Sequence, residues 1–148
     1  MKQAARPSSI KLFAFLYVAQ AAVSFIHNLR NVDALGKGLQ VATAMEVDDG
    51  HGLAVAVSRL AIALLLGWWL WTRASNMAKW LIILLCLPRL TQIGDAWFAL
   101  AQVKPNAIFW LVASVLYLAA IWQLFRQDAR YWFATKGRTP KNNALVFD

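Results

Sequence analysis

Four long apolar runs limit what this chain can fold into more than any other feature of its sequence. They cover residues 12–27, 53–71, 80–101 and 107–125, and short polar segments separate them. The hydrocarbon core of a bilayer is about 30 Å thick and takes about 20 helical residues to cross. Exposed strand edges are excluded in lipid, because their backbone polar groups would have no hydrogen-bond partners. The runs therefore predict an all-α integral membrane protein, a bundle of four transmembrane helices.

The composition agrees with a membrane protein. Of the 148 residues, 60% are hydrophobic and 15% are charged. A soluble domain of ordinary composition has about 25% charged residues. Eight tryptophans and eight phenylalanines argue against disorder. We expect one four-span membrane domain over residues 1–133 and a mobile cytoplasmic tail over residues 134–148.

Basic residues predict the orientation of the spans, since Lys and Arg of short loops accumulate on the cytoplasmic side. Most of them lie in the N-terminal segment, between the second and third spans, and after the fourth span: Lys2, Arg6, Lys11, Arg73, Lys79, Arg126, Arg130, Lys136, Arg138 and Lys141. The other two connections hold Arg30, Lys37 and Lys104. We therefore expect both termini in the cytoplasm, in a membrane such as the bacterial inner membrane.

The net charge of +8 predicts anionic lipid headgroups as partners and no nucleic acid, because the basic residues do not form one continuous face. After the fourth span, residues 126–133 alternate basic and aromatic side chains, as in a helix that leaves the membrane at the inner interface. Tryptophans near the ends of the spans predict anchoring at the headgroup level, with ligand stacking as the alternative.

Polar residues inside the apolar runs form the candidate functional site. Burying a charge at the bilayer centre costs at least about 2.5 kcal/mol unless the charge is paired or hydrated. The first and third runs each carry three polar residues on one helical face, and the second run carries an arginine. The candidate ligand-binding residues are Gln20, Ser24, His27, Arg59, Arg89, Gln92 and Asp95.

Two interpretations of this polar interior stay open. Arg59 and Asp95 fall at similar depth in antiparallel helices, which predicts an ion pair. Arg89 lies near the midplane, directly after Pro88, which predicts a kink. Either these groups satisfy one another and fix the order of the helices, or they line a hydrated cavity reached from outside. Because two arginines outnumber one aspartate, such a cavity favours an anionic ligand.

The connection between the first two spans, residues 28–52, is the longest one outside the tails. The apolar spacing of residues 39–47 predicts a short surface helix. Asp48, Asp49 and His51 are close in sequence but far from a calcium-loop pattern, so we expect a solvated turn there. The sequence predicts neither a metal site nor a cofactor.

Catalytic motifs are missing from the sequence, which has no HExxH, phosphate loop, GxGxxG or serine–histidine–acid set. The single cysteine, Cys86, excludes an intramolecular disulfide. We therefore expect a non-catalytic membrane protein, either an accessory protein for another membrane protein or a protective, immunity-like one. The first alternative is an oligomeric transport or sensing unit with an intramembrane anion site. The second is a small membrane enzyme acting on a lipid-like substrate.

Overall fold

The computed structural model of this chain describes residues 6–43, 50–91 and 105–136. Within these ranges the chain forms helices and turns and contains no strand, so the all-helical prediction is confirmed. The helices are α1 (Ser8–Arg30), α2 (Val32–Thr43), α3 (Gly50–Arg73), α4 (Asn76–Thr91), α6 (Pro105–Gln123) and α7 (Gln127–Ala134).

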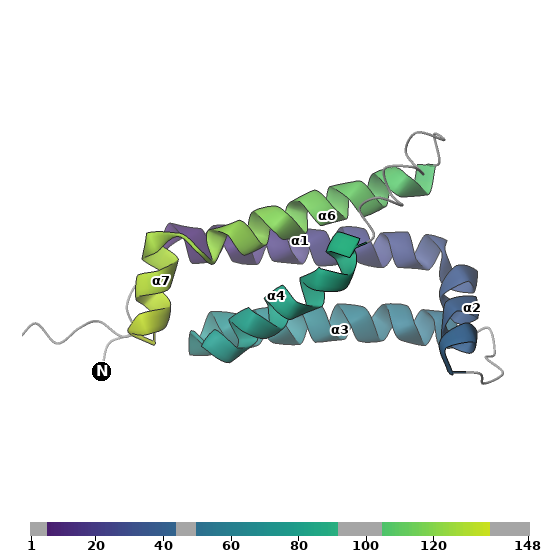
Figure 1. Cartoon of the computed structure of the whole chain (residues 1–148), viewed down its shortest axis with the longest axis horizontal. Helices are drawn as coiled ribbons and strands as arrows, with labels where there is room; N and C mark the ends of the chain where they lie inside the picture. Colours follow the sequence, from purple (N-terminus) through teal and green to yellow (C-terminus); the bar gives the residue numbers. More distant parts are fainter. Residues whose placement is uncertain (1–5, 44–49, 92–104, 137–148) are drawn as a thin grey trace, which may run out of the picture.

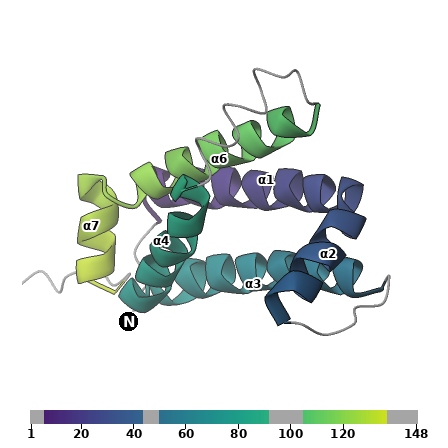
Figure 2. The ribbon, with the colours of Figure 1, turned by 45° about the vertical axis from the view of Figure 1, so that its right-hand side comes forward.

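The long helices α1, α3 and α6 lie side by side along the long axis of the molecule (Figure 1). Helices α1 and α3 are antiparallel, and α2 joins them across one end of the molecule. Helix α6 lies along α1, and α4 crosses from the end of α3 towards α6, as the second view also shows (Figure 2). Helix α7 covers the end opposite α2, so the start of α1 and the end of the described chain lie at the same end.

The described helices fit a membrane protein. Helices α1 and α3 are each long and apolar enough to cross a membrane. A third candidate span exists if α6 and α7, which meet at a bend of 62°, count as one broken span. The expected third span extends to residue 101, and its part beyond Thr91 lies outside the described residues. The bundle of four spans therefore stays a prediction.

The hydrophobic core lies in the half of the molecule that α7 covers. Phe13 and Tyr17 of α1 stack with their ring centroids 5.2 Å apart. Fully buried alanines on α6, Ala113 and Ala120, allow this helix to lie close to α1. Aromatic side chains and small residues together form a core that joins α1, α3, α4, α6 and α7.

A two-residue turn joins α3 to α4 and sets their antiparallel packing. Ala74 ends α3 in the left-handed region, with φ of 46°, which is unfavourable for a residue with a side chain. Ser75 begins α4 as its N-cap, since its Oγ accepts a hydrogen bond from the Ala78 amide at 3.3 Å. The chain therefore reverses within one helical turn.

The connection between α1 and α3 is more helical than its sequence predicts. The expected surface helix covers residues 39–47, whereas α2 begins at Val32 and ends at Thr43. Close packing at Gly52 explains the early start: a Cβ placed on Gly52 would collide with the carbonyl oxygen of Val32. The absence of a side chain at Gly52 lets the start of α2 lie directly against α3.

Candidate functional site

A cavity of about 480 Å³ lies between the helices, in the half of the molecule nearer to α2. Helices α1, α2, α3, α4 and α6 all contribute to its wall. Its apolar wall includes Phe25, Ala63 and Trp110. Its polar lining residues are Tyr17, Gln20, Ser24, His27, Asn28, Arg59 and Tyr117. The volume falls in the range of sites that bind small molecules.

The structure brings four of the predicted site residues to this one cavity. Gln20, Ser24 and His27 reach it from α1, and Arg59 reaches it from α3. The Arg89 side chain, Gln92 and Asp95 lie outside the described part of the chain, and so does the expected Arg59–Asp95 ion pair. Pro88, the neighbour of Arg89, also lines the cavity.

Local hydrogen bonds organise the polar face of α1. The Gln20 side chain is buried, at 6% exposure, and its Nε2 donates to Ser24 Oγ at 2.8 Å. One turn beyond His27, Asn31 Nδ2 donates to the His27 carbonyl oxygen at 2.7 Å. These spacings of three and four residues keep the polar groups on one side of α1. A ligand in the cavity would therefore meet an amide, a hydroxyl and an imidazole in series.

Two tyrosines close the cavity on the side of the hydrophobic core. The rings of Tyr17 and Tyr117 lie 5.8 Å apart, between α1 and α6. The Tyr117 hydroxyl donates to the carbonyl oxygen of Ile82 on α4 at 2.7 Å, as a buried phenol requires. On α3, Gly67 leaves room for the Tyr17 ring, because a Cβ there would lie 3.2 Å from it. The tyrosines thus separate the cavity from the core.

Arg59 supplies the positive charge of the site. Its side chain is exposed and also lines the cavity, so we place it at the cavity mouth. The described lining includes no carboxylate. The arrangement therefore offers a guanidinium and several neutral hydrogen-bonding groups to a ligand, next to apolar walls. Such a site favours an acceptor-rich or anionic group attached to an apolar body.

Sequence reasoning missed several residues that line this cavity. Asn28 is four residues after Ser24, so extending the polar stripe of α1 by one turn would have found it. No sequence pattern identifies the aromatic lining residues Tyr17, Tyr117 and Trp110. An aromatic residue in an apolar run is equally typical of a protein core, a lipid-facing surface and a cavity wall.

The described residues contain no group of three or more His, Cys, Asp or Glu side chains placed to hold a metal ion. His51, at the start of α3, is exposed, and Asp48 and Asp49 lie outside the described residues. No protein-family model, curated protein or solved structure matches this chain. The function is therefore argued from the site itself.

Proposed function

We propose that this membrane protein binds a small amphipathic molecule with an anionic or acceptor-rich head in the cavity between α1, α3, α4 and α6. Binding of this kind fits a transport or sensing unit better than a purely structural accessory protein. The observation that carries the proposal is the convergence of Gln20, Ser24, His27 and Arg59 on a space that they do not fill.

The chemistry of the lining supports this ligand class. Hydrogen-bond donors lie on α1 and α3, while Phe25, Ala63 and Trp110 supply apolar surface. A purely apolar guest would gain no electrostatic attraction from Arg59, and a small inorganic anion would leave the apolar wall without contact. An amphipathic anion would interact with Arg59 and also contact the apolar wall.

We also propose that both termini are cytoplasmic, which places the cavity in the outer half of the membrane. The distribution of basic residues supports this orientation. The start of α1, the end of α3 and α7 lie at one end of the bundle, and the basic residues in or next to these segments are Arg6, Lys11, Arg73, Arg126, Arg130 and Lys136. Arg30 and Lys37 lie at the other end. A cavity in the outer half would exchange its ligand with the outer leaflet or the external solution.

Cysteine labelling tests the orientation. Cys86 is buried, so a Cys86→Ala background removes the natural thiol without changing the surface. A cysteine in place of Val41, which is 86% exposed on α2, should react with an impermeant thiol reagent added to intact cells. A cysteine in place of Lys136 should react only after the cells are opened. The reverse pattern would invert the orientation.

A substitution that fills the cavity with a larger side chain tests the proposal that the cavity binds a ligand. Ala63 lines the cavity, whereas Ala61, on the same helix, is exposed and does not line it. We expect an anionic amphipath to copurify with the wild-type protein and with Ala61→Phe, and to be absent from Ala63→Phe. Extraction and mass spectrometry of each purified variant provide the measurement, and circular dichroism confirms its helicity. Arg59→Gln should weaken retention without filling the space.

The same purification distinguishes the cavity proposal from the accessory-protein hypothesis. If a second membrane protein copurifies in stoichiometric amount and its retention is indifferent to Ala63→Phe, the interaction hypothesis replaces the cavity proposal. If folded Ala63→Phe and wild-type protein retain the same small molecules in the same amounts, the cavity does not bind them and the proposal fails.

A further inference from the structure

Helix α7 is attached to the protein by its apolar side. The chain leaves α6 through a turn in which the Leu124 amide donates to the Ile121 carbonyl oxygen at 2.9 Å. It then continues as α7 at 62° to α6. Ala129, Trp132 and Phe133 are buried in the core shared with α1, α3 and α4. The apolar face of α7 is therefore already occupied by protein, and lipid is not needed to cover it.

Two polar contacts hold α7 in this position. Asp128 Oδ2 accepts a hydrogen bond from the Ser9 amide in the first turn of α1, at 3.3 Å. Lys79 of α4 is buried, at 8% exposure, and its Nζ lies 4.5 Å from the centroid of the Phe125 ring and 5.4 Å from that of Phe133. Asp128 thus fastens α7 to α1, and Lys79 joins α4 to Phe133 of α7 and to Phe125 in the preceding turn.

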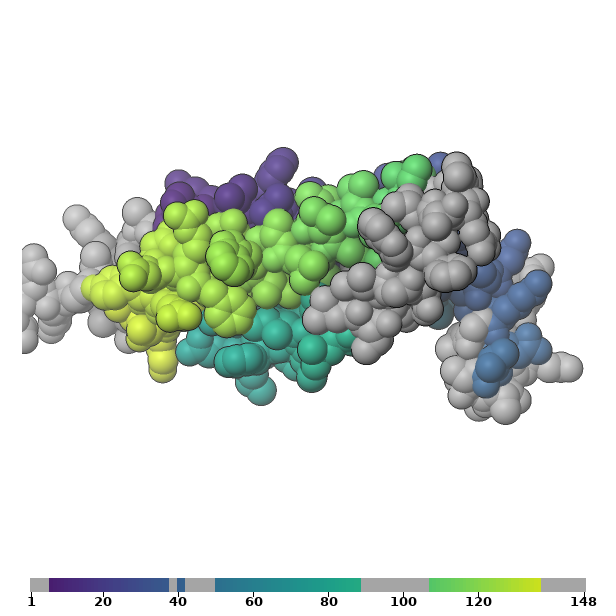
Figure 3. Space-filling model, turned by 45° about the horizontal axis from the view of Figure 1, so that its top comes forward, coloured from purple at the N-terminus to yellow at the C-terminus, as the bar shows by residue number. Residues whose placement is uncertain are grey.

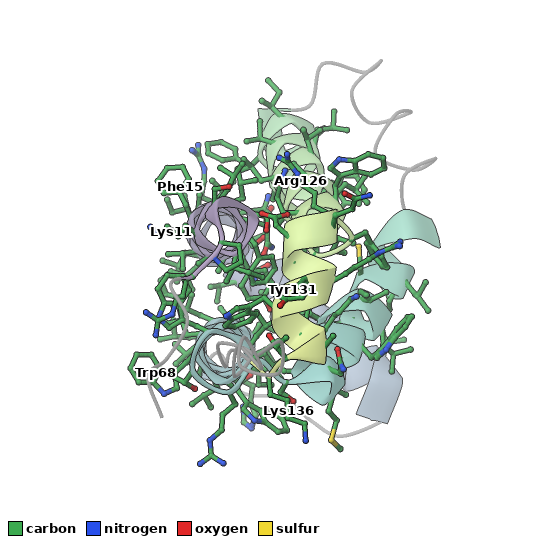
Figure 4. The ribbon with its side chains drawn as sticks, turned by 90° about the vertical axis from the view of Figure 1, so that its left-hand side faces the viewer. Lys11, Phe15, Trp68, Arg126, Tyr131 and Lys136 are labelled. Carbon is green, nitrogen blue, oxygen red and sulfur yellow. The ribbon has the colours of Figure 1, made fainter. Side chains whose placement is uncertain are left out.

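The exposed part of α7 and the residues that flank it are basic. Arg130 and Tyr131 are exposed within α7, Arg126 is exposed directly before the helix, and Lys136 is exposed two residues after it. An end view shows Arg126, Tyr131 and Lys136 on and around α7, with Lys11 of α1 nearby (Figure 4). Asp128, the one acidic residue of α7, is engaged with Ser9 on the other side. This end of the molecule therefore has a strong excess of positive charge.

Exposed aromatic residues surround the same end. Trp68 near the end of α3, Trp80 near the start of α4 and Trp122 near the end of α6 are all exposed, and Figure 4 shows Trp68 at the edge of the end view. In a space-filling view α7 lies across the surface beside α4 and continues from α6 (Figure 3). Exposed Trp and Tyr prefer the headgroup level of a bilayer, so the aromatic residues place α7 at that level independently of its charge.

We propose that the exposed surface formed by Arg130 and Tyr131 of α7 with Arg126 and Lys136 at its two ends is a preformed binding surface for the phosphate groups of anionic phospholipids. An ordinary interfacial helix inserts its apolar face into lipid and responds to lipid packing. The apolar face of α7 is packed on protein, so this surface selects lipids by headgroup charge. This inference is independent of the cavity and its ligand.

Lipid binding to the full-length protein in detergent tests the proposal. Phosphatidylglycerol and zwitterionic phosphatidylcholine are titrated separately, and native mass spectrometry counts the bound molecules. We expect wild-type protein to prefer phosphatidylglycerol, and the preference to fall as salt rises. Each basic residue near an anionic surface contributes about a fivefold factor in affinity. Arg126→Gln with Arg130→Gln should therefore weaken phosphatidylglycerol binding about 25-fold.

The chain offers a matched control at its other end. Arg30→Gln with Lys37→Gln removes the same charge from the end near α2 and should change phosphatidylglycerol binding less than twofold. An equal loss in both double variants would show a net-charge effect and overturn the proposal. So would the absence of a phosphatidylglycerol preference in wild-type protein, a result that does not depend on the folding of any variant. Ala63→Phe, which fills the cavity, should keep the phosphatidylglycerol preference, so this proposal and the cavity proposal can fail separately.

Discussion

The Tyr117 hydroxyl on α6 and the Ile82 carbonyl oxygen on α4 are 2.7 Å apart and form a buried hydrogen bond between these two helices. Within the described residues α4 packs mainly against α3 and only lightly against α6. This hydrogen bond therefore fixes where α4 crosses α6. Because Tyr117 also lines the cavity, the same contact positions part of the cavity wall.

Tyr117→Phe should lower the stability of the protein by about 1 kcal/mol, since it removes a buried hydrogen bond but keeps the ring. For a chain of this size that corresponds to a fall of about 2–4 °C in the thermal unfolding midpoint in detergent. Tyr131→Phe is the control, because Tyr131 is exposed. An unchanged midpoint for Tyr117→Phe would show that the hydrogen bond does not hold α4 on α6.

Gly52→Ala should destabilise the junction of α2 and α3 by about 1–3 kcal/mol, the usual cost of overpacking. The added methyl would collide with the Val32 carbonyl oxygen, a backbone atom that moves only if α2 moves. Gly50→Ala makes the same chemical change two residues earlier, where nothing lies within 4 Å. Thermal unfolding of both variants gives the comparison, and an equal effect at the two glycines would contradict the close packing.

Asp128 should make the attachment of α7 dependent on pH. Burial raises the pKa of the Asp128 carboxyl, but hydrogen bonds from Ser9 and from the α7 backbone outweigh burial and hold this pKa below its usual range. The charged form is thus favoured in the folded protein, so its contribution to stability is complete above about pH 4 and is lost as pH falls through the lowered pKa.

Asp128→Ala should therefore cost about 0.5–1 kcal/mol at neutral pH, as loss of a helix cap does, and the difference from wild type should shrink at acid pH. Unfolding midpoints at pH 7 and at about pH 3 provide the test. Asp33→Ala, at an exposed acidic residue on α2, controls for general loss of negative charge. A difference that stays constant over this pH range would exclude a role for the ionised carboxylate.

Apolar length predicts the helices well, because a run of this length has few alternatives to a membrane helix. The expected spans 12–27 and 53–71 lie inside α1 and α3, and most of span 107–125 lies in α6. Sequence reasoning placed the start of α2 wrongly. That start depends on contact between backbone atoms at Gly52 and Val32. Such contacts join residues far apart in the chain and leave no local periodicity.

Part of the candidate site can also be predicted from the sequence. Helical spacing alone puts Gln20, Ser24 and His27 on one face, and the cost of burying a charge turns Arg59 towards a polar environment. Lys79 shows the limit of this reasoning. Its position between two spans predicts an ordinary basic loop residue, yet α7 folds back and buries it among aromatic rings. That burial follows from the bend after α6, which sequence spacing does not encode.

Two glutamines, the buried Gln20 and the half-buried Gln123, separate a structural role of the polar interior from a functional one. Gln20 lines the cavity and donates to Ser24. Gln123, near the end of α6, does not line it, and its Oε1 is buried without a hydrogen-bond partner. Gln123→Leu removes an unsatisfied acceptor and should raise stability by about 1–3 kcal/mol.

Gln20→Leu makes the same change where the polar group has a partner, and should cost about 1 kcal/mol. It should also reduce retention of the copurifying amphipath, whereas Gln123→Leu should leave retention unchanged. Thermal unfolding and mass spectrometry of the extracted ligand, measured on the same preparations, give both quantities. If Gln20→Leu lowers stability but releases no ligand, the polar face of α1 serves helix packing alone, and Gln20 has no part in ligand binding.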